Sequence, residues 1–359
     1  MSKSAEHHPS DRVDLPIRIS DYDFEFPQEL VAQRAAPKGE SRLMHAPLNG
    51  GVRTIIPARQ IVELFRQGDC MVVNTTKVIP ARIRETRETG GQQEVLLVAP
   101  RPDLEGLVWE AWVRPGKRFR LGMEATVAGH EVKVIEVLKD GARLLRFDCT
   151  PEEFQEMLQQ RGAVPLPPYI KRDAEEEDRE AYQAIFAKHD GAVAAPTASL
   201  HFSQQMLDAL VAKGVIIAEV TLHVGPGTFQ PIGVEDAREH PIHGERFFLT
   251  AQEAEKINRA AATGGRVIAI GTTVARVIET VADEEGVLCA AEGITHKYIY
   301  PGYRWKRVDG LVTNFHWPKS TLLLLVSAFY GRENLLEAYR EAFKAKMRLF
   351  SYGDGMVIL

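Results

Sequence analysis

The stretch RVIAIGTTVARVIETVAD, residues 266–283, contains a strand, a turn and a helix in immediate succession. RVIAI (266–270) predicts a strand, and VARVIETVAD (274–283) continues as a helix. The turn at 271–273 would place backbone N–H groups and hydroxyls at the carboxyl edge of a sheet, where α/β folds bind polar ligands. A glycine at such a turn also has a purely steric explanation, and GTT lacks the glycine spacing and the lysine of a phosphate loop.

Strands and helices also alternate on both sides of this stretch. CMVVN (70–74) reads as a strand, and VIIAEVTLHV (215–224) reads as another, after a helix that Ser203 would cap. Thr250 and Glu253 have the spacing of a capping box and would start the helix that precedes RVIAI. Alternating strands and helices predict an α/β layer fold.

The middle of the chain has a different pattern. Four short alternating runs are separated by Gly, Pro and Asp: 93–99, 107–113, 131–137 and 142–148. Their even spacing predicts a small β-barrel. A chain of 359 residues is also long enough for about two domains.

We therefore predict an α/β layer domain with an inserted small β-barrel domain. Residues 16–74 and 151–359 would form the α/β catalytic domain, and residues 75–150 the barrel. The segment 1–15 is polar, and we expect it to be a disordered tail. It has no apolar region of the kind found in signal peptides, so we do not expect it to be one.

Composition excludes several classes of protein. The chain is 45% hydrophobic and 26% charged, and no apolar run approaches the ~18 residues of a membrane span. Its three cysteines stand far apart, which argues against a disulfide framework and for the reducing cytoplasm. The net charge of −5 does not indicate a nucleic-acid binder. The basic loop RPGKRFR (114–120) is either a solvated hairpin tip or a patch that contacts phosphates.

Several loops gather histidines and glycines. PTASLHF (196–202) ends near His201, which is either an acid/base or a buried capping histidine. LHVGPGTF (222–229) contains Gly225 and Gly227, which let a ligand approach the backbone or simply make a turn.

The segment HPIHGE (240–245) brings together His240, His243 and Glu245. The spacing is not that of a zinc-binding helix, and no third protein ligand of a metal is apparent. General acid/base chemistry is therefore favoured over a metal site.

The segment NFHWPKST (314–321) places Asn314, His316 and Lys319 just before an apolar helix. Ser320 or Thr321 would cap that helix. Capping does not explain why an amide, an imidazole and an ammonium group should gather there, so these three are candidate ligand contacts.

Taken in order, seven motifs resemble one known family. They are NTTKVIPAR (74–82), GAVAAPTASLHF (191–202), VTLHVGPGTFQP (220–231), HPIHGE (240–245), VIAIGTT (267–273), TNFHWPKSTLLLLVSAF (313–329) and FSYGDGM (350–356). Together they resemble the S-adenosylmethionine:tRNA ribosyltransferase-isomerases of queuosine biosynthesis, from about Asp21 to Met356. The specificity of the resemblance comes from the ordered set, since no single motif is diagnostic.

The resemblance implies a particular reaction. The ribosyl part of S-adenosylmethionine would be transferred to 7-aminomethyl-7-deazaguanine at the wobble position of a tRNA with a GUN anticodon. Epoxyqueuosine would form, and adenine and methionine would leave. The family also implies a cytoplasmic monomer with S-adenosylmethionine as co-substrate, no metal and no membrane partner.

The reaction needs several proton transfers, which histidines near neutral pKa can supply. We expect His201 and His243, supported by Glu245, to carry them. S-adenosylmethionine would contact Gly225, Gly227, Gly271, Thr272 and Thr273. Other substrate contacts are expected from Lys77, Arg82, Tyr169, Thr197, Asn314, His316 and Lys319.

The chain departs from the family pattern at three positions. Thr75 stands where an aspartate is common, Ser199 replaces a glycine and Pro226 replaces an alanine, while Arg276 keeps an arginine of the family. One alternative is therefore a member that binds tRNA or S-adenosylmethionine without turnover. Another is a metal-dependent hydrolase that uses the HPIHGE segment.

Overall fold

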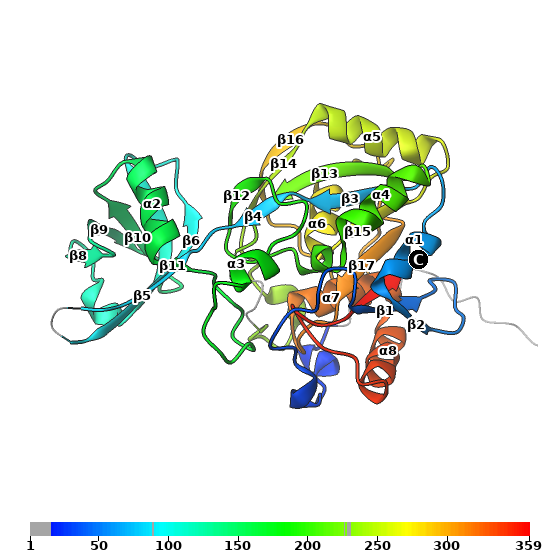
Figure 1. Cartoon of the computed structure of the whole chain (residues 1–359), viewed down its shortest axis with the longest axis horizontal. Helices are drawn as coiled ribbons and strands as arrows, with labels where there is room; N and C mark the ends of the chain where they lie inside the picture. Colours follow the sequence, from blue (N-terminus) through cyan, green and yellow to red (C-terminus); the bar gives the residue numbers. More distant parts are fainter. Residues whose placement is uncertain (1–15, 88–89, 226, 228–230) are drawn as a thin grey trace, which may run out of the picture.

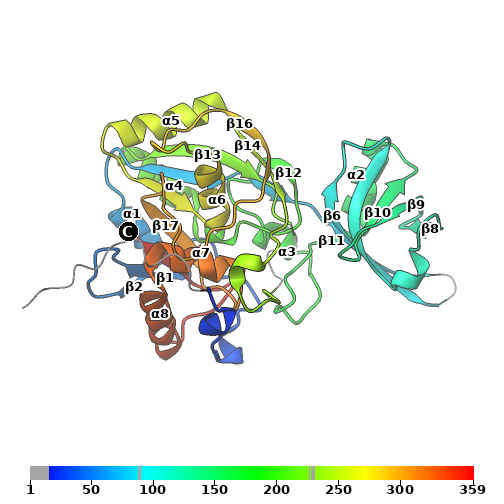
Figure 2. The same ribbon diagram turned by 180° about the vertical axis from the view of Figure 1, so that it is seen from behind.

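The computed structural model describes residues 16–87, 90–225, 227 and 231–359, so the predicted tail, 1–15, lies outside the described residues. Two β-sheets organise the chain, a larger one on the right of Figure 1 and a smaller one on the left. Figure 2 shows the same two parts from behind. The prediction of a mixed α/β fold is confirmed.

The larger sheet has nine strands, and the four at its centre are parallel. Its strands, in spatial order, are β16 (Ala291–Thr295), β14 (Glu245–Leu249), β13 (Ile216–Leu222), β3 (Cys70–Asn74), β15 (Val267–Ile270), β17 (Gly310–Asn314), β18 (Gly355–Ile358), β1 (Arg42–Ala46) and β2 (Thr54–Pro57). β13, β3, β15 and β17 run parallel to their neighbours in this group. Their carboxyl ends therefore meet along one edge of the sheet.

Helices cover both faces of this sheet. Its central strands are apolar on both sides, so both faces must be shielded from water. Cys70 and Val72 of β3 belong to a core that includes α5–α8, whereas Met71 and Val73 pack with α1 and α4 on the other face. On the first face lie α5 (Ala251–Ala262), α6 (Thr272–Val281), α7 (Thr321–Tyr330) and α8 (Arg332–Lys344); on the second lie α1 (Ile61–Leu64) and α4 (Gln204–Ala212). The result is a three-layer α/β arrangement, as Figures 1 and 2 show.

Side-chain caps start these helices where the sequence predicts them. The hydroxyls of Ser203 and Ser320 accept hydrogen bonds from the first turns of α4 and α7. Thr150 and Glu153 form a complete capping box at α2 (Pro151–Arg161). The Thr250 hydroxyl caps α5 by accepting a hydrogen bond from the Glu253 amide. The Glu253 carboxylate does not complete a capping box; it accepts a hydrogen bond from the Glu219 amide at 2.8 Å.

The smaller sheet is antiparallel and open. Its seven strands, in spatial order, are β11 (Gly162–Ala163), β5 (Arg82–Thr86), β6 (Gln92–Pro100), β7 (Leu107–Arg114), β10 (Arg143–Phe147), β9 (His130–Val137) and β8 (Glu124–Val127). Among the described residues, the two end strands β11 and β8 are not paired with each other. The sheet is a curled half-barrel, and the predicted small β-barrel is not confirmed. Closure requires hydrogen bonding between the two end strands, which here have only two and four residues.

The helix α2 covers the open side of the curled sheet. Its apolar stripe of Phe154, Met157 and Leu158 packs into the same core as Trp109 and Phe147 of that sheet. The segment 151–163, assigned by prediction to the α/β domain, therefore packs with the smaller sheet. An apolar stripe predicts that a helix is buried but does not identify the surface that buries it.

Two short strands and one short helix lie between the two sheets. β4 (Thr76–Val78) pairs in parallel with β12 (His189–Ala192), and α3 (Asp178–Ala181) follows a proline-rich segment at 165–168. Within the described residues, no helix has both the length and the apolar composition needed to cross a membrane.

Candidate active site

The carboxyl ends of the parallel strands are joined by one buried amide. Asn74, the last residue of β3, donates from Nδ2 to the Leu222 carbonyl oxygen at 3.0 Å and to the Thr273 hydroxyl at 3.3 Å. Its Oδ1 accepts from the Leu222 amide at 3.0 Å. One side chain thus ties together the ends of β3 and β13 and the start of α6. The turn after β15 begins with Gly271 at a φ of 103°, a backbone conformation that favours glycine.

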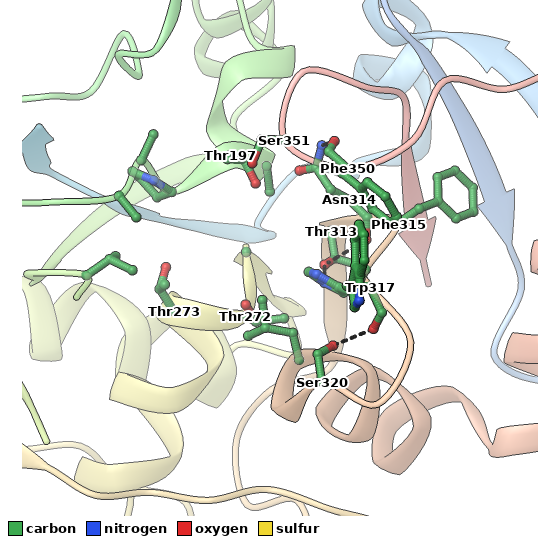
Figure 3. A pocket seen from close by; sticks show the side chains of 18 of the residues that line it. Thr197, Thr272, Thr273, Thr313, Asn314, Phe315, Trp317, Ser320, Phe350 and Ser351 are labelled. Carbon is green, nitrogen blue, oxygen red and sulfur yellow. Dashed lines mark hydrogen bonds between the residues drawn. The ribbon is translucent and has the colours of Figure 1, made fainter. Parts of the chain in front are cut away.

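A small cavity lies at this edge, and we call it the strand-edge cavity. Its volume is about 60 Å³, enough for a few water molecules. Seven of the predicted site residues line it: Tyr169, Thr197, Gly271, Thr272, Thr273, Asn314 and His316. Figure 3 shows the threonines at the start of α6 across the cavity from the segment that follows β17. The structure therefore brings together three loops that are distant in sequence.

Aromatic rings form one wall of the strand-edge cavity. Tyr169 stacks on Trp317 with ring centroids 5.7 Å apart and planes at 16°, and Trp317 lies 5.1 Å from Phe350. The hydroxyls of Tyr169 and Ser351 are hydrogen-bonded at 2.6 Å. A wall of this kind offers flat π-surfaces for a planar ligand such as a nucleobase.

The polar groups after β17 are held firmly. His316 Nε2 and the Thr313 hydroxyl are 2.7 Å apart, and the His316 amide donates to the Tyr339 hydroxyl at 2.6 Å. Burial lowers the pKa of His316 to about 3, so the imidazole is neutral at physiological pH. Asn314 Nδ2 donates to the Phe350 carbonyl oxygen at 3.0 Å.

A much larger cavity lies between the two sheets, and we call it the histidine cavity. Its volume is about 940 Å³, within the range of sites that bind nucleotide-sized ligands. Four histidines line it: His223, His240, His243 and His296. Gly225, Gly227 and Glu245 line it as well. The two cavities share the side chain of Leu322.

Glu245 is held in a buried ion pair. One carboxylate oxygen accepts from the Gly225 amide at 3.0 Å, and the other contacts the Arg276 guanidinium. Both side chains are less than 10% exposed. Arg276 also donates to the Lys297 carbonyl oxygen at 3.0 Å. The carboxylate of Glu245 therefore holds the backbone of Gly225, and Arg276 compensates its charge.

His223 is a cavity residue to which the sequence motifs did not assign a role. Its Nδ1 lies 2.8 Å from the Thr76 hydroxyl, and a Cβ atom on Gly191 would lie only 2.7 Å from the ring. Burial, and then the nearby positive charges of Arg246 and His189, lower the pKa of His223. The sequence did contain a signal for His223, because this residue directly follows a strand. The carboxyl ends of parallel strands face the ligand-binding edge of a sheet.

Two other histidines of the cavity come from the HPIHGE segment. Burial, followed by the neighbouring His243, lowers the pKa of His240. The His243 ring leaves no room for a side chain at Gly227, where a Cβ atom would lie 2.7 Å away. Among the described residues, no group of three or more His, Cys, Asp or Glu side chains could hold a metal ion.

His201 lies apart from both cavity surfaces. It is 3% exposed, its Nδ1 lies 2.7 Å from the Ser41 hydroxyl, and its ring packs against the Gly355 backbone. Burial lowers its pKa to about 4, although Asp354 and Asn314 act in the opposite direction. The structure thus places His201 behind the strand-edge cavity, in contact with residues that support it.

Three predicted substrate contacts lie outside both cavities. Lys77 pairs with Asp190 at 3.2 Å, and Lys319 pairs with Asp23 at 2.5 Å. Arg82 lines a third cavity, next to the smaller sheet.

Two of the departures from the family pattern are buried near the strand ends. Thr75 is fully enclosed and bonded to the Thr221 hydroxyl at 2.8 Å. Ser199 is also fully buried, and its hydroxyl has no hydrogen-bond partner among the described residues. The third, Pro226, lies outside the described residues.

Comparison with known proteins identifies the family. A family model described as "Queuosine biosynthesis protein" matches residues 19–358. The S-adenosylmethionine:tRNA ribosyltransferase-isomerase of Geobacter sulfurreducens is 47% identical over 341 residues, covering 95% of this chain and 99% of the relative. That of Acetivibrio thermocellus is 45% identical over 346 residues, with 95% and 100% covered.

A solved structure is also similar to the chain. The crystal structure of an S-adenosylmethionine tRNA ribosyltransferase from Thermotoga maritima has 33% sequence identity and a TM-score of 0.53. The match covers 94% of this chain and 100% of that one. The resemblance found in the sequence motifs is confirmed, and the chain belongs to the queuosine biosynthesis protein family.

Proposed function

We propose that the protein is an S-adenosylmethionine:tRNA ribosyltransferase-isomerase. It would transfer and isomerise the ribosyl part of S-adenosylmethionine onto 7-aminomethyl-7-deazaguanine at the tRNA wobble position, forming epoxyqueuosine and releasing adenine and methionine. The observation that carries the proposal is a cavity of about 940 Å³ that four histidines line; through Leu322 it adjoins the strand-edge cavity, which the turn between β15 and α6 lines. Family membership over almost the whole chain supports the same reaction.

We assign the binding of S-adenosylmethionine to the region where the two cavities adjoin. The hydroxyls of Thr272 and Thr273 and the backbone of Gly271 would contact its polar groups from one side. Gly225 and Gly227 would allow close approach from the other. The stacked rings of Tyr169 and Trp317 offer a surface for a planar base, with Thr197, Asn314 and His316 at its edge.

We assign the proton transfers to the histidines of the large cavity. His243 and His223 both face it, and the lowered pKa of His223 keeps that imidazole neutral and able to accept a proton. Glu245 would act by positioning, because Arg276 and the Gly225 amide already occupy its oxygens. The position of His201 favours a supporting role behind Asn314 over direct contact with substrate.

The remaining assignments concern the tRNA substrate and the state of the protein that binds it. A tRNA with a GUN anticodon would be the second substrate, bound by a cytoplasmic monomer, with no metal or membrane taking part. We infer that the smaller β unit, predicted as an inserted barrel, provides part of the tRNA surface. Lys77 and Lys319 would contact the tRNA only if their pairs with Asp190 and Asp23 open.

One experiment tests the reaction directly. The purified protein is incubated with S-adenosylmethionine and tRNA that carries the deazaguanine base. Adenine release should match, mole for mole, a mass gain on the wobble nucleoside. If both substrates bind and no adenine appears, the proposal is wrong and the non-turnover alternative replaces it. If a chelator abolishes turnover and a stoichiometric transition metal restores it, the assignment of proton transfer without a metal is wrong.

A further inference from the structure

A third cavity lies between the smaller sheet and the proline-rich segment that follows it; we call it the arginine groove. Its volume is about 570 Å³. One side is the outward face of β5, β6 and β7, and the other is formed by residues 165–168 and 170–173. The proposed chemistry places no reacting group in this groove.

Strand register places the sheet side chains of the groove in two rows. In one row, Arg82 pairs with Leu96, and Leu96 pairs with Trp112. In the next row, Arg84 pairs with Glu94, and Glu94 pairs with Arg114. Residues two apart on a strand share a face, so both rows point into the groove.

The positive charges of the groove differ in whether they form an ion pair with a described residue. Arg84 is paired with Glu94 at 2.5 Å and with Asp173 at 2.6 Å. Among the described residues, no ion pair involves Arg82, Arg114 or Lys171, which also line the groove. The groove therefore holds, within one concave surface, three cations that form no direct ion pair with a described residue.

Arg82 is the most enclosed of the three. Its Nε atom is buried and has no hydrogen-bond partner in the part of the chain that the structure describes. Burial lowers the pKa of this guanidinium, and the nearby Glu94 offsets the effect only in part. A buried N–H donor without a partner is costly, so its presence indicates a ligand acceptor that binds there.

The opposite wall is pre-organised. Prolines at 165, 167 and 168 stiffen the chain, and Arg172 anchors its end with two hydrogen bonds to Asp178, at 2.6 and 2.8 Å. The Tyr352 hydroxyl donates to the same carboxylate at 2.6 Å. The groove thus exists before any ligand binds, which reduces the entropy cost of binding.

Trp112 links the groove to the proposed active site. Its side chain lines both the arginine groove and the histidine cavity. A strand whose reacting base enters the histidine cavity would therefore pass Trp112 on its way to the groove that holds the three cations. Aromatic rings stack on unpaired bases of any sequence, and arginines bind phosphates.

We propose that the arginine groove binds the RNA strand adjoining the reacting nucleotide. Arg82, Arg114 and Lys171 contact its phosphodiester, and Trp112 stacks on the neighbouring base. This inference rests on the proposed function, since it assumes that the reacting base belongs to an RNA.

The test uses single substitutions in the full chain. Arg114→Gln and Lys171→Gln change exposed side chains, Arg82→Gln removes the buried donor, and Trp112→Leu removes the ring. Each of the three charge variants should raise the KM for tRNA about tenfold while kcat and the KM for S-adenosylmethionine stay unchanged, and Trp112→Leu should raise the KM for tRNA as well. Each charge variant should also lower the slope of log KM against log salt by about 0.7. The matched control is Arg259→Gln, an exposed arginine on α5, a helix of the larger unit that lies far from the smaller sheet in Figure 1.

A binding assay separates failure of this inference from failure of the proposed reaction. An anticodon stem-loop RNA is titrated against each variant without S-adenosylmethionine. Suppose that the unmodified protein shows no turnover but binds this RNA, and that the groove variants weaken binding. RNA binding by the groove is then confirmed, and the proposed reaction is not. If the groove variants match Arg259→Gln in both assays, the inference is wrong. It is also wrong if the KM for S-adenosylmethionine rises as much as that for tRNA.

Discussion

The histidine cavity and the arginine groove share Trp112 as a wall, yet they hold their charges in different ways. In the cavity, Glu245 and Arg276 form an ion pair that is less than 10% exposed. In the groove, the Arg84 side chain is 50% exposed in its pair with Glu94. Electrostatic interactions between enclosed charges are stronger, and the charged side chains are held in place, as proton-transfer chemistry requires. Exposed charges suit a ligand that must bind and leave. Strand β14 and helix α6 of the larger unit supply the first pair, and the outer face of the smaller antiparallel sheet supplies the second.

The largest expected difference between the two regions concerns these ion pairs. Arg276→Met leaves the buried Glu245 carboxylate without its counterion, and we expect the free energy of unfolding to fall by about 3–5 kcal/mol. Arg84→Met should lower it by less than about 1 kcal/mol, since that pair is exposed. Urea unfolding of both variants measures the contrast. The double variant Arg276→Met/Glu245→Leu should recover most of the loss; equal losses in the two single variants would contradict the comparison.

Acid should destabilise the larger region through its buried histidines. The pKa of His201 is about 4 in the folded protein, below its ordinary value near 6.5. Between these two values the unfolded chain binds a proton that the folded chain does not. Stability is therefore complete above about pH 6.5 and falls as the pH drops toward 4, by about 3 kcal/mol for this residue.

Urea unfolding at several pH values tests this linkage. His201→Gln should lose about 3 kcal/mol less than the unmodified protein between pH 7 and pH 4. The control is His130→Gln on β9 of the smaller sheet, where the side chain is only partly buried. Parallel profiles for all three proteins would refute the role of His201.

The proposed proton transfer predicts a loss of turnover without a loss of binding. His243→Ala should lower kcat by about 100-fold or more, while the affinities for S-adenosylmethionine and tRNA change little. The groove variants should show the reverse pattern, a raised KM for tRNA at constant kcat. Single-turnover adenine release and equilibrium binding measure both quantities, with His130→Ala as the matched control. Full turnover by His243→Ala would remove this residue from the proposed chemistry.

The smallest expected effect compares one helix cap from each region. Thr150→Ala breaks the complete capping box of α2 and should cost about 1 kcal/mol of unfolding free energy. Thr250→Ala at α5 should cost less, because Glu253 bonds to the Glu219 amide instead of returning to the cap. Chemical unfolding measures both variants. A larger cost for Thr250→Ala would show that the reciprocal bond of Glu153 contributes nothing.

Elements governed by local patterns were predicted well from the sequence. The alternating runs at 93–99 and 107–113 became β6 and β7, and Ser203 and Thr150 cap helices where their spacing predicts. Alternation and capping involve residues within a few positions of each other, so the chain itself carries the signal.

Part of the candidate site was predictable for a related reason. Gly271 and Asn314 each end or follow a parallel strand, and such ends converge wherever the sheet forms. A short polar turn after an apolar strand therefore indicates a position at the ligand edge. His223 also directly follows an apolar strand, so the same rule indicates it as a candidate site residue.

The sequence alone determined the α/β class, the helix caps, the strand-end loops and the family of this protein, because each depends on local spacing or on ordered motifs. Only the tertiary structure decided what those residues contact. It placed His201 behind the cavity against Ser41 and Gly355, and it paired Glu245 with Arg276. It also left the smaller sheet open beneath α2. These outcomes depend on contacts between segments far apart in the chain, and local periodicity carries no information about such partners.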